Sequence, residues 1–187
     1  MLGLYQEWAP VYDQTIAQFG RYLSPDRIAD MAARLCSRDV PVLDLACGTG
    51  LLGQALAGLG FTNLTGVDLS APMLARAAGK GCYARLVTAD LSGPWPFEAG
   101  AFGLVTCAGA FLQGHLGAVV LTRAVAGLPP GGVLLADVEA GTFEAEGYAG
   151  VLAGLEAAGA EVALEEGHFY APAEGEPAHG WFVTVRV

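Results

Sequence analysis

The chain has 187 residues, of which 53% are apolar, and its formal net charge is −10. This length suits one domain with its own core, and no apolar run reaches the roughly 20 residues of a membrane helix. After Ala124 only Arg186 is basic, against ten acidic residues. Nucleic-acid binding rests on Lys and Arg, so the charge favours a neutral or cationic small molecule instead, or it serves solubility alone.

The predicted elements alternate between strands and helices after an aromatic-rich helical arm over 2–19. Short apolar runs without alternation indicate strands buried on both faces, as in a parallel sheet. Ser24 and Ser70 are predicted N-caps, and Gly60 is predicted to end a helix. The predicted strands are 40–45, 64–69, 85–89, 102–107, 133–138, 161–170 and 181–187, and the predicted helices are 24–37, 51–59, 72–79, 116–128 and 143–158.

This order predicts an α/β fold with a Rossmann-like doubly wound sheet of seven strands, mostly parallel with an antiparallel C-terminal strand. No helix fits between 161–170 and 181–187, so these two strands must pair antiparallel. The segment between them, 171–180, is expected to be a mobile loop. We expect a single domain over 1–187, with an N-terminal arm over 1–23 and a C-terminal β-hairpin over 160–187.

Val42–Gly50, VLDLACGTG, is the strongest local motif. A buried strand ends in a glycine turn that opens a helix, where backbone N–H groups are free and a ligand can approach closely. Asp68 follows at the end of the second strand, where a carboxylate can accept both hydroxyls of a ribose. The alternative is that the glycines only form a turn and that Asp68 only caps the next helix. This alternative explains each feature separately but not why they occur together.

Gly48–Gly53, GTGLLG, also matches the dinucleotide fingerprint G-x-G-x-x-G, and Asp68 lies at the fitting distance from it. An NAD-dependent oxidoreductase is therefore an alternative. Asp44 counts against it, because a carboxylate at the strand end does not help to bind a pyrophosphate. The chain also lacks a Tyr-x-x-x-Lys pair, since Lys80 is its only lysine, and a C-terminal antiparallel hairpin is unusual in dinucleotide folds.

Taken together, several segments resemble the class I S-adenosylmethionine-dependent methyltransferases. They are Asp44-x-x-Cys47-Gly48-x-Gly50, Asp68, Ala89-Asp90-Leu91, Pro129–Gly132 and the aromatic segment Tyr5–Asp13, which resembles the N-terminal cap of that family. The segments Gly109–Leu116 and Glu144–Tyr148 are similar to the Williams–Beuren-region type of small methyltransferase. The resemblance spans nearly the whole chain and implies S-adenosyl-L-methionine as the cofactor.

The resemblance also implies which residues hold this cofactor. Ala46, Cys47, Gly48 and Gly50 would line its methionine part, and Asp44 would hold the amino end. Asp68 would bind the ribose and Asp90 the adenine amino group. The residues implied in cofactor binding are Tyr12, Asp44, Ala46, Cys47, Gly48, Gly50, Asp68, Leu69, Asp90, Leu91, Cys107 and Ala108. Two alternatives stay open: Asp90 caps a turn, and Tyr12 is ordinary core.

The catalytic candidate is His115, a general base placed after the fourth strand, where the methyl group would emerge. The alternative is that His115 caps the helix at 116–128. The residues Phe111, Phe143, Tyr148 and Tyr170 could line an acceptor pocket, or belong to the core. No metal is expected, because the four cysteines lie in no C-x-x-C pair and near no histidine cluster.

These observations predict an S-adenosylmethionine-dependent methyltransferase with a small-molecule acceptor. A protein that binds the cofactor without catalysis is a further alternative. Cys107-Ala108-Gly109-Ala110 is not the Asp/Asn-Pro-Pro-Tyr sequence of amino-methylating nucleic-acid enzymes. We expect a cytoplasmic location, because no signal-peptide pattern begins the sequence. We also expect a monomer or homodimer, with no nucleic-acid partner given the acidic charge and no membrane partner given the short apolar runs.

Overall fold

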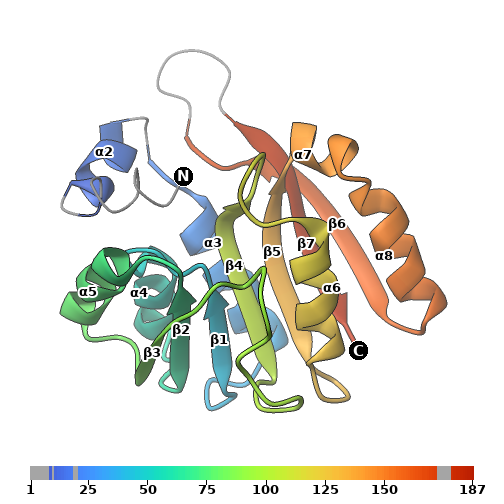
Figure 1. Ribbon diagram of the computed structural model, residues 1–187, viewed down its shortest axis with the longest axis horizontal. Helices are drawn as coiled ribbons and strands as arrows, with labels where there is room; N and C mark the ends of the chain where they lie inside the picture. The colour runs from blue at the N-terminus through green and yellow to red at the C-terminus, as the bar shows by residue number, and fades with distance from the viewer. Residues whose placement is uncertain (1–8, 10, 19–20, 172–177) are drawn as a thin grey trace.

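The computed structural model describes residues 9, 11–18, 21–171 and 178–187, which form a mixed sheet with helices on both faces (Figure 1). The strands are β1 (Val42–Leu45), β2 (Leu64–Asp68), β3 (Arg85–Thr88), β4 (Leu104–Phe111), β5 (Val133–Glu139), β6 (Glu161–His168) and β7 (His179–Arg186). The helices are α2 (Tyr12–Gln18), α3 (Ser24–Leu35), α4 (Leu51–Gly58), α5 (Ala71–Lys80), α6 (Ala118–Ala126), α7 (Ala140–Ala145) and α8 (Tyr148–Ala157).

The seven strands of this sheet follow the order β3-β2-β1-β4-β5-β7-β6. The first five are parallel to one another, whereas β7 runs antiparallel to both β5 and β6. The predicted fold class, including the antiparallel C-terminal strand and its pairing with 161–170, is confirmed. The strand order reverses between β1 and β4, which is where folds of this kind open a crevice for ligands.

Each face of the sheet has its own apolar core. Ile28 of α3 and Leu56 of α4 belong to one core, with the strand residues of that face. Leu121 of α6 and Tyr148 of α8 belong to the other. Because helices cover both faces, β1 is buried along its full length, and this burial explains why its sequence is continuously apolar except for Asp44.

Two helix predictions need correction. The predicted helix over 143–158 is two helices, α7 and α8, because Gly147 between them has a φ of +68° and cannot continue a helix. Ser24 is not an N-cap; Leu23 occupies that position, and the Ser24 side chain is fully buried instead. Ser70 does cap α5, because its side chain accepts the Met73 N–H at 3.4 Å.

The fourth strand is longer than predicted. β4 runs on to Phe111, and its register against β5 shifts between Cys107 and Phe111. Gly109, in the middle of this irregular stretch, has a φ of +69°. Residues with small side chains and a glycine suggest a loop in sequence, but here they form a β-bulge, a feature that re-aims side chains at the end of a strand.

The arm before α3 is fixed to the C-terminal hairpin. Tyr22 pairs with Tyr170 as an isolated antiparallel bridge, and the two rings stack with centroids 4.9 Å apart. Half of the predicted arm helix over 2–19 lies outside the described residues, and within the described half α2 is helical. The predicted loop over 171–180 also lies mostly outside them. Across the described part of the chain, no helix has the length and apolar character to cross a membrane.

Candidate functional site

A cavity of about 240 Å³ opens at the carboxyl ends of the parallel strands. It lies where the strand order reverses, beside β1, β2 and β4. Backbone turns after these strands form most of its wall, together with α2. The cavity is lined by Tyr12, Ala46, Gly48, Asp68, Leu69, Ser70, Met73, Ala89, Asp90, Leu91, Ser92, Ala108, Gly109, Ala110, Gly114, His115 and Leu116.

A smaller cavity of about 40 Å³ adjoins the first one and shares four lining residues with it. It reaches past the glycine turn towards Asp44 and the N-terminus of α3. Its lining is Tyr12, Tyr22, Pro25, Asp44, Ala46, Cys47, Gly48, Thr49, Leu51, Leu52 and Ala108. Neither lining contains a lysine or an arginine among the described residues, whereas aspartates line both. The combined site therefore suits a cationic ligand better than an anionic one.

Asp68 holds the glycine turn in place. Its Oδ2 accepts the Gly48 N–H at 2.9 Å and its Oδ1 accepts the Ser70 N–H at 2.8 Å. Gly48 has a φ of +53°, which favours glycine at this position. Burial raises the pKa of the Asp68 carboxyl, and the backbone hydrogen bonds oppose this. The carboxylate thus organises the turn and also lines the large cavity.

Asp44 lies beneath the turn, with 1% of its surface exposed. Its Oδ2 accepts the Tyr83 hydroxyl at 2.6 Å, and its Oδ1 accepts the Thr106 hydroxyl at 3.3 Å. Burial raises the pKa of Asp44 to about 7, although both hydrogen bonds favour the ionised form. Asp44 also lines the smaller cavity, where a cation would stabilise its charge.

Leu69 and Asp90, which the family resemblance places at the adenine, both lie at the large cavity. Leu69 leaves 47% of its surface exposed and faces the large cavity, so an apolar ring placed there would cover it. Asp90 is exposed and lines the same cavity, while its Oδ1 accepts the Ser92 N–H at 2.8 Å. The turn-capping alternative for Asp90 therefore holds, and it does not remove Asp90 from the cavity wall.

The structure brings ten of the twelve predicted cofactor residues to one or both cavities. They are Tyr12, Asp44, Ala46, Cys47, Gly48, Asp68, Leu69, Asp90, Leu91 and Ala108. Gly50 and Cys107 line neither cavity. Gly50 is the N-cap of α4, and the fully buried Cys107 side chain belongs to the core. Tyr12 is half-buried and lines both cavities, so it is not ordinary core.

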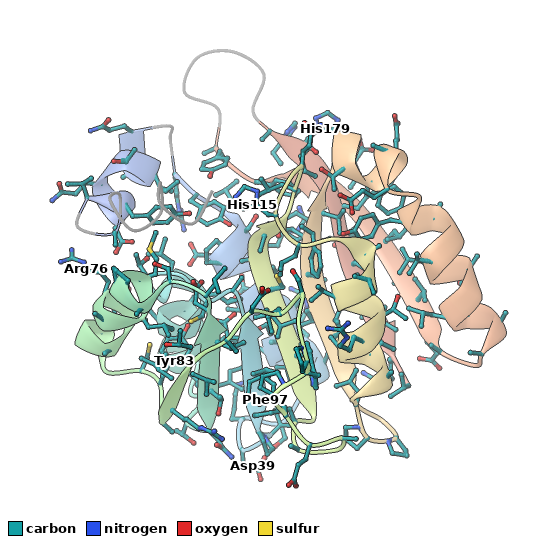
Figure 2. All side chains as sticks on the ribbon, viewed as in Figure 1. Asp39, Arg76, Tyr83, Phe97, His115 and His179 are labelled. Carbon is teal, nitrogen blue, oxygen red and sulfur yellow. The ribbon has the colours of Figure 1, made fainter. Side chains whose placement is uncertain are left out.

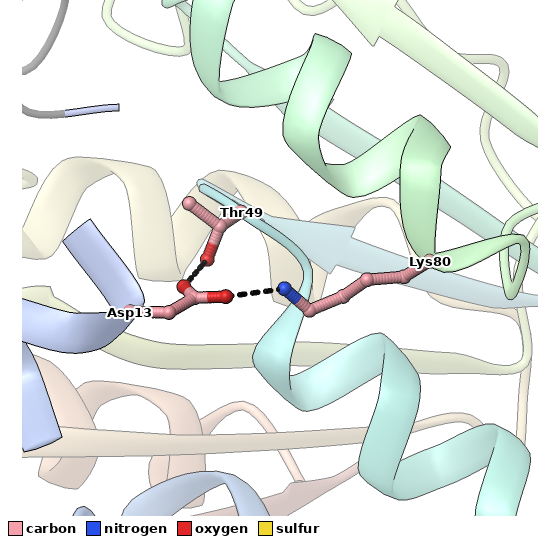
Figure 3. A network of polar contacts seen from close by, with 3 residues as sticks. All are labelled: Asp13, Thr49 and Lys80. Atoms are coloured by element: carbon pink, nitrogen blue, oxygen red, sulfur yellow. Dashed lines mark hydrogen bonds and ion pairs between the residues drawn. The ribbon is translucent and has the colours of Figure 1, made fainter. Parts of the chain in front are cut away.

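A polar cluster joins α2 to the glycine turn (Figure 3). Asp13 accepts a hydrogen bond from the Thr49 hydroxyl at 2.5 Å through one carboxylate oxygen. Its other oxygen pairs with the Lys80 ammonium at 2.6 Å, at the C-terminal end of α5. The Lys80 side chain is 15% exposed, so water screens this ion pair only in part. The cluster fixes α2 where the neighbouring Tyr12 reaches both cavities.

The opposite end of the large cavity is formed by the bulge of β4. The Gly109 N–H donates to Asp137 Oδ1 at 2.6 Å, from the neighbouring strand β5. Burial raises the pKa of Asp137 to about 6, against the lowering effect of Ser24 and this N–H. The Ser24 hydroxyl faces the carboxyl without reaching hydrogen-bond geometry to its Oδ2. Asp137 therefore fixes the bulge from below.

His115 lines the large cavity beyond the bulge (Figure 2). It does not cap α6, because Gly117 is the N-cap there and no side chain caps that helix. Its Nδ1 lies 3.2 Å from the Gln113 carbonyl oxygen. A carbonyl only accepts, so this contact is a hydrogen bond in the tautomer that carries a proton on Nδ1.

Several cavity residues were not predicted. Ser70 and Ser92 directly follow the predicted contacts Leu69 and Leu91 and could have been found from them, and Met73 lies in the first turn of the helix that Ser70 caps. Tyr22 could not, because a bridge to the distant C-terminal hairpin places it. Of the proposed acceptor-pocket aromatics, Phe111, Phe143 and Tyr148 pack on one another in the core. Tyr170 stacks on Tyr22 and packs against the core of the other face.

Residues 42–132, which hold the glycine turn and most of the large cavity, match the family model described as "Methyltransferase domain". By this match, residues 42–132 are similar to a methyltransferase domain. The sequence of the chain is similar to human "Methyltransferase-like protein 27", with 37% identity over 119 residues, which are 62% of this chain and 48% of that protein. The chain thus spans about half the length of this relative.

Solved methyltransferases share the fold of this chain. The structure entitled "DhpI-SAH complex structure" aligns with a TM-score of 0.67 and 22% identity, over 99% of this chain and 94% of that chain. A TehB-like SAM-dependent methyltransferase from Corynebacterium glutamicum aligns with a TM-score of 0.67 and 22% identity, over 98% of this chain and 97% of that chain. The narrower Williams–Beuren-region likeness stays a prediction.

Proposed function

We propose that this protein transfers a methyl group from S-adenosylmethionine to a small acceptor that is neutral or cationic. The observation that carries the proposal is the acidic double cavity at the strand-order reversal. Asp44, Asp68 and Asp90 line it, and no lysine or arginine does so among the described residues. Such a lining suits a ligand with an ammonium and a sulfonium, and it disfavours the pyrophosphate of NAD.

The residues present fit the proposed cofactor. Gly48 has no side chain, so a ligand in the cavity can contact its backbone directly. The Asp68 carboxylate could accept hydrogen bonds from a ribose. Leu69 and Leu91 supply apolar surface for an adenine. The smaller cavity ends at Asp44, whose carboxylate would face the ammonium group. When bound, the cofactor supplies a methyl group that is already activated, so the protein needs chiefly to orient the acceptor.

The acceptor would bind at the bulge end of the large cavity. Gly109, Ala110 and Gly114 provide a wall of small residues there, and His115 is the titratable side chain on that wall. An imidazole on this wall could accept a proton from an acceptor that must lose one. The fixed bulge holds the acceptor side rigidly, which favours in-line transfer through orientation.

The lack of Lys and Arg in both linings also supports the acceptor class. A carboxylate or phosphate acceptor would enter a cavity that Asp68 and Asp90 line, with no lysine or arginine among the described lining residues, and uncompensated negative charge disfavours its binding. A neutral or amine-bearing acceptor meets no such cost. A cytoplasmic location and the lack of a nucleic-acid or membrane partner remain part of this proposal, as does the monomer or homodimer.

The cofactor is tested by thermal unfolding with candidate ligands. S-Adenosylhomocysteine at 100 times its Kd should stabilise the protein by about 2.7 kcal/mol through mass action, and NAD should have no effect. Mass spectrometry of ligands that co-purify with the protein provides an independent check. Stabilisation by NAD alone would overturn the proposal. Binding without turnover across a panel of amines, phenols and carboxylic acids would favour a cofactor-binding protein without catalysis.

A further inference from the structure

Three glycines in and around the glycine turn leave room for the ring of Tyr83. A Cβ on Gly50 would lie 3.0 Å from Tyr83 Cε2, and a Cβ on Gly66 would lie 3.0 Å from Tyr83 Cε1. At Gly53 a Cβ would lie 2.2 Å from both Cζ and the hydroxyl oxygen of Tyr83, a separation that real atoms do not show. The last glycine of G-x-G-x-x-G therefore serves Tyr83 and not a pyrophosphate.

This packing places the Tyr83 hydroxyl against Asp44, at the base of the smaller cavity. Tyr83 follows α5 in sequence and lies beside β2, beneath the helices of that face (Figure 2). Its hydroxyl donates to Asp44 Oδ2 at 2.6 Å, whereas the Thr106 hydroxyl reaches Oδ1 at a longer 3.3 Å. The shorter bond and the enclosed ring make Tyr83 the main fixed partner of Asp44.

The remaining titratable groups around Asp44 do not neutralise its charge. They are Asp68 on β2, Cys47 in the glycine turn, Cys82 beside Tyr83 and Cys107 on β4. None of these is a cation. Burial and the Asp68 charge raise the pKa of Asp44, and the hydroxyl bonds from Tyr83 and Thr106 lower it. The balance between burial and hydrogen bonding thus sets the charge at the base of the smaller cavity.

We propose that Tyr83 is a positioning residue for cofactor binding, because its hydroxyl favours the ionised form of the Asp44 carboxylate and aims it at the cofactor's ammonium group. This inference rests on the proposed function. Loss of the hydroxyl removes a hydrogen bond that favours the charged carboxylate, so Asp44 would take up a proton at higher pH. Cofactor affinity would then fall near neutral pH, while at alkaline pH, where Asp44 is ionised in either protein, it would change little.

The variant Tyr83→Phe tests this, because it keeps the ring in its glycine-lined space and removes only the hydroxyl. A hydrogen bond to a charged group corresponds to a pKa shift of roughly one to two units. The Kd of S-adenosylhomocysteine is measured by calorimetry from pH 6 to pH 9. At each pH the ratio of variant to wild-type Kd cancels the titration of the ligand itself. We expect a ratio of about ten at pH 7 that falls towards one at pH 9.

Tyr148→Phe is the matched control. It removes a hydroxyl from another largely buried tyrosine, which lies on the opposite face of the sheet and bonds to the Leu116 carbonyl. Its Kd ratio should stay near one at every pH. A Tyr83→Phe ratio that is equal at all pH values, whether raised or near one, would overturn the inference, because a purely structural role does not follow the Asp44 charge.

A double-mutant cycle gives a second, independent readout. In an Asp44→Asn background the carboxylate is absent, so adding Tyr83→Phe should leave the Kd unchanged. A further tenfold loss in the double variant would contradict the proposed role. If the wild type binds no S-adenosylhomocysteine at any pH, the proposed function fails and this inference with it, an outcome distinct from a pH-independent Tyr83→Phe effect.

Discussion

The buried carboxyl of Asp44 makes the stability of the ligand-free protein depend on pH. Burial raises its pKa from 3.8 to about 7. The folded state therefore binds a proton that the unfolded state releases, and this stabilisation is complete below about pH 4 and lost as the pH rises through 7. Between pH 5 and pH 8 the linkage relation gives a loss of about 3 kcal/mol from Asp44. Asp137, with its pKa raised to about 6, adds about 1 kcal/mol.

Urea unfolding at pH 5 and pH 8 measures this difference. The wild type should lose about 4 kcal/mol of unfolding free energy over the interval, and Asp44→Asn should lose only about 1 kcal/mol, because its amide does not titrate. Asp30→Asn removes the same charge from an exposed position of α3 and should behave as the wild type. An Asp44→Asn protein with the full wild-type pH dependence would refute the reasoning that burial controls this carboxyl.

Five further substitutions test other parts of the structure. Lys80→Met removes the ion pair that fixes α2, and should weaken S-adenosylhomocysteine binding by about 1 kcal/mol, seen by stopped flow as faster dissociation; an unchanged rate would refute the role of the cluster. Asp68→Ala should weaken binding more strongly, because ribose hydrogen bonds to a charged group are worth roughly 1.5–3 kcal/mol each, and calorimetry with an unchanged Kd would contradict this. His115→Ala should lower turnover roughly 10²–10⁴-fold with little change in cofactor Kd, whereas wild-type turnover would rule out a general base. Gly53→Ala should destabilise the protein by about 1–3 kcal/mol against Tyr83, while Gly79→Ala, in open space on α5, should stabilise it by about 0.5–1 kcal/mol; equal thermal shifts for the two alanines would oppose the packing argument.

The sequence predicts the fold class well because its signals are local. The apolar runs and the glycine turn each depend on neighbouring residues, so the strand order and the site edge follow from general rules of α/β folds. Where local signals conflict, the prediction fails. Gly109 suggests a loop but lies in a bulge inside β4, and Gly147 looks tolerable within a helix but separates α7 from α8.

The site was predictable only where its residues lie within a motif. Asp44 and Asp68 are found from their spacing to the glycine turn. Tyr83 belongs to no motif, and its role appears only when α5 and β2 are folded together. Asp137 is similar, because a residue in the middle of an apolar strand gives no sign that it bonds to the Gly109 N–H of a neighbouring strand.

The place of β7 in the sheet has a consequence for how the protein folds. β7 lies between β5 and β6, so β6 touches the sheet only through β7. β6 can therefore join the sheet only together with β7, or after β7 has docked on β5. Until then the β5 edge offers unpaired backbone groups to other chains, which is a known route to aggregation. Once docked, β6 becomes the outer edge, and its exposed Glu161, Glu165 and Glu166 discourage further strand addition there.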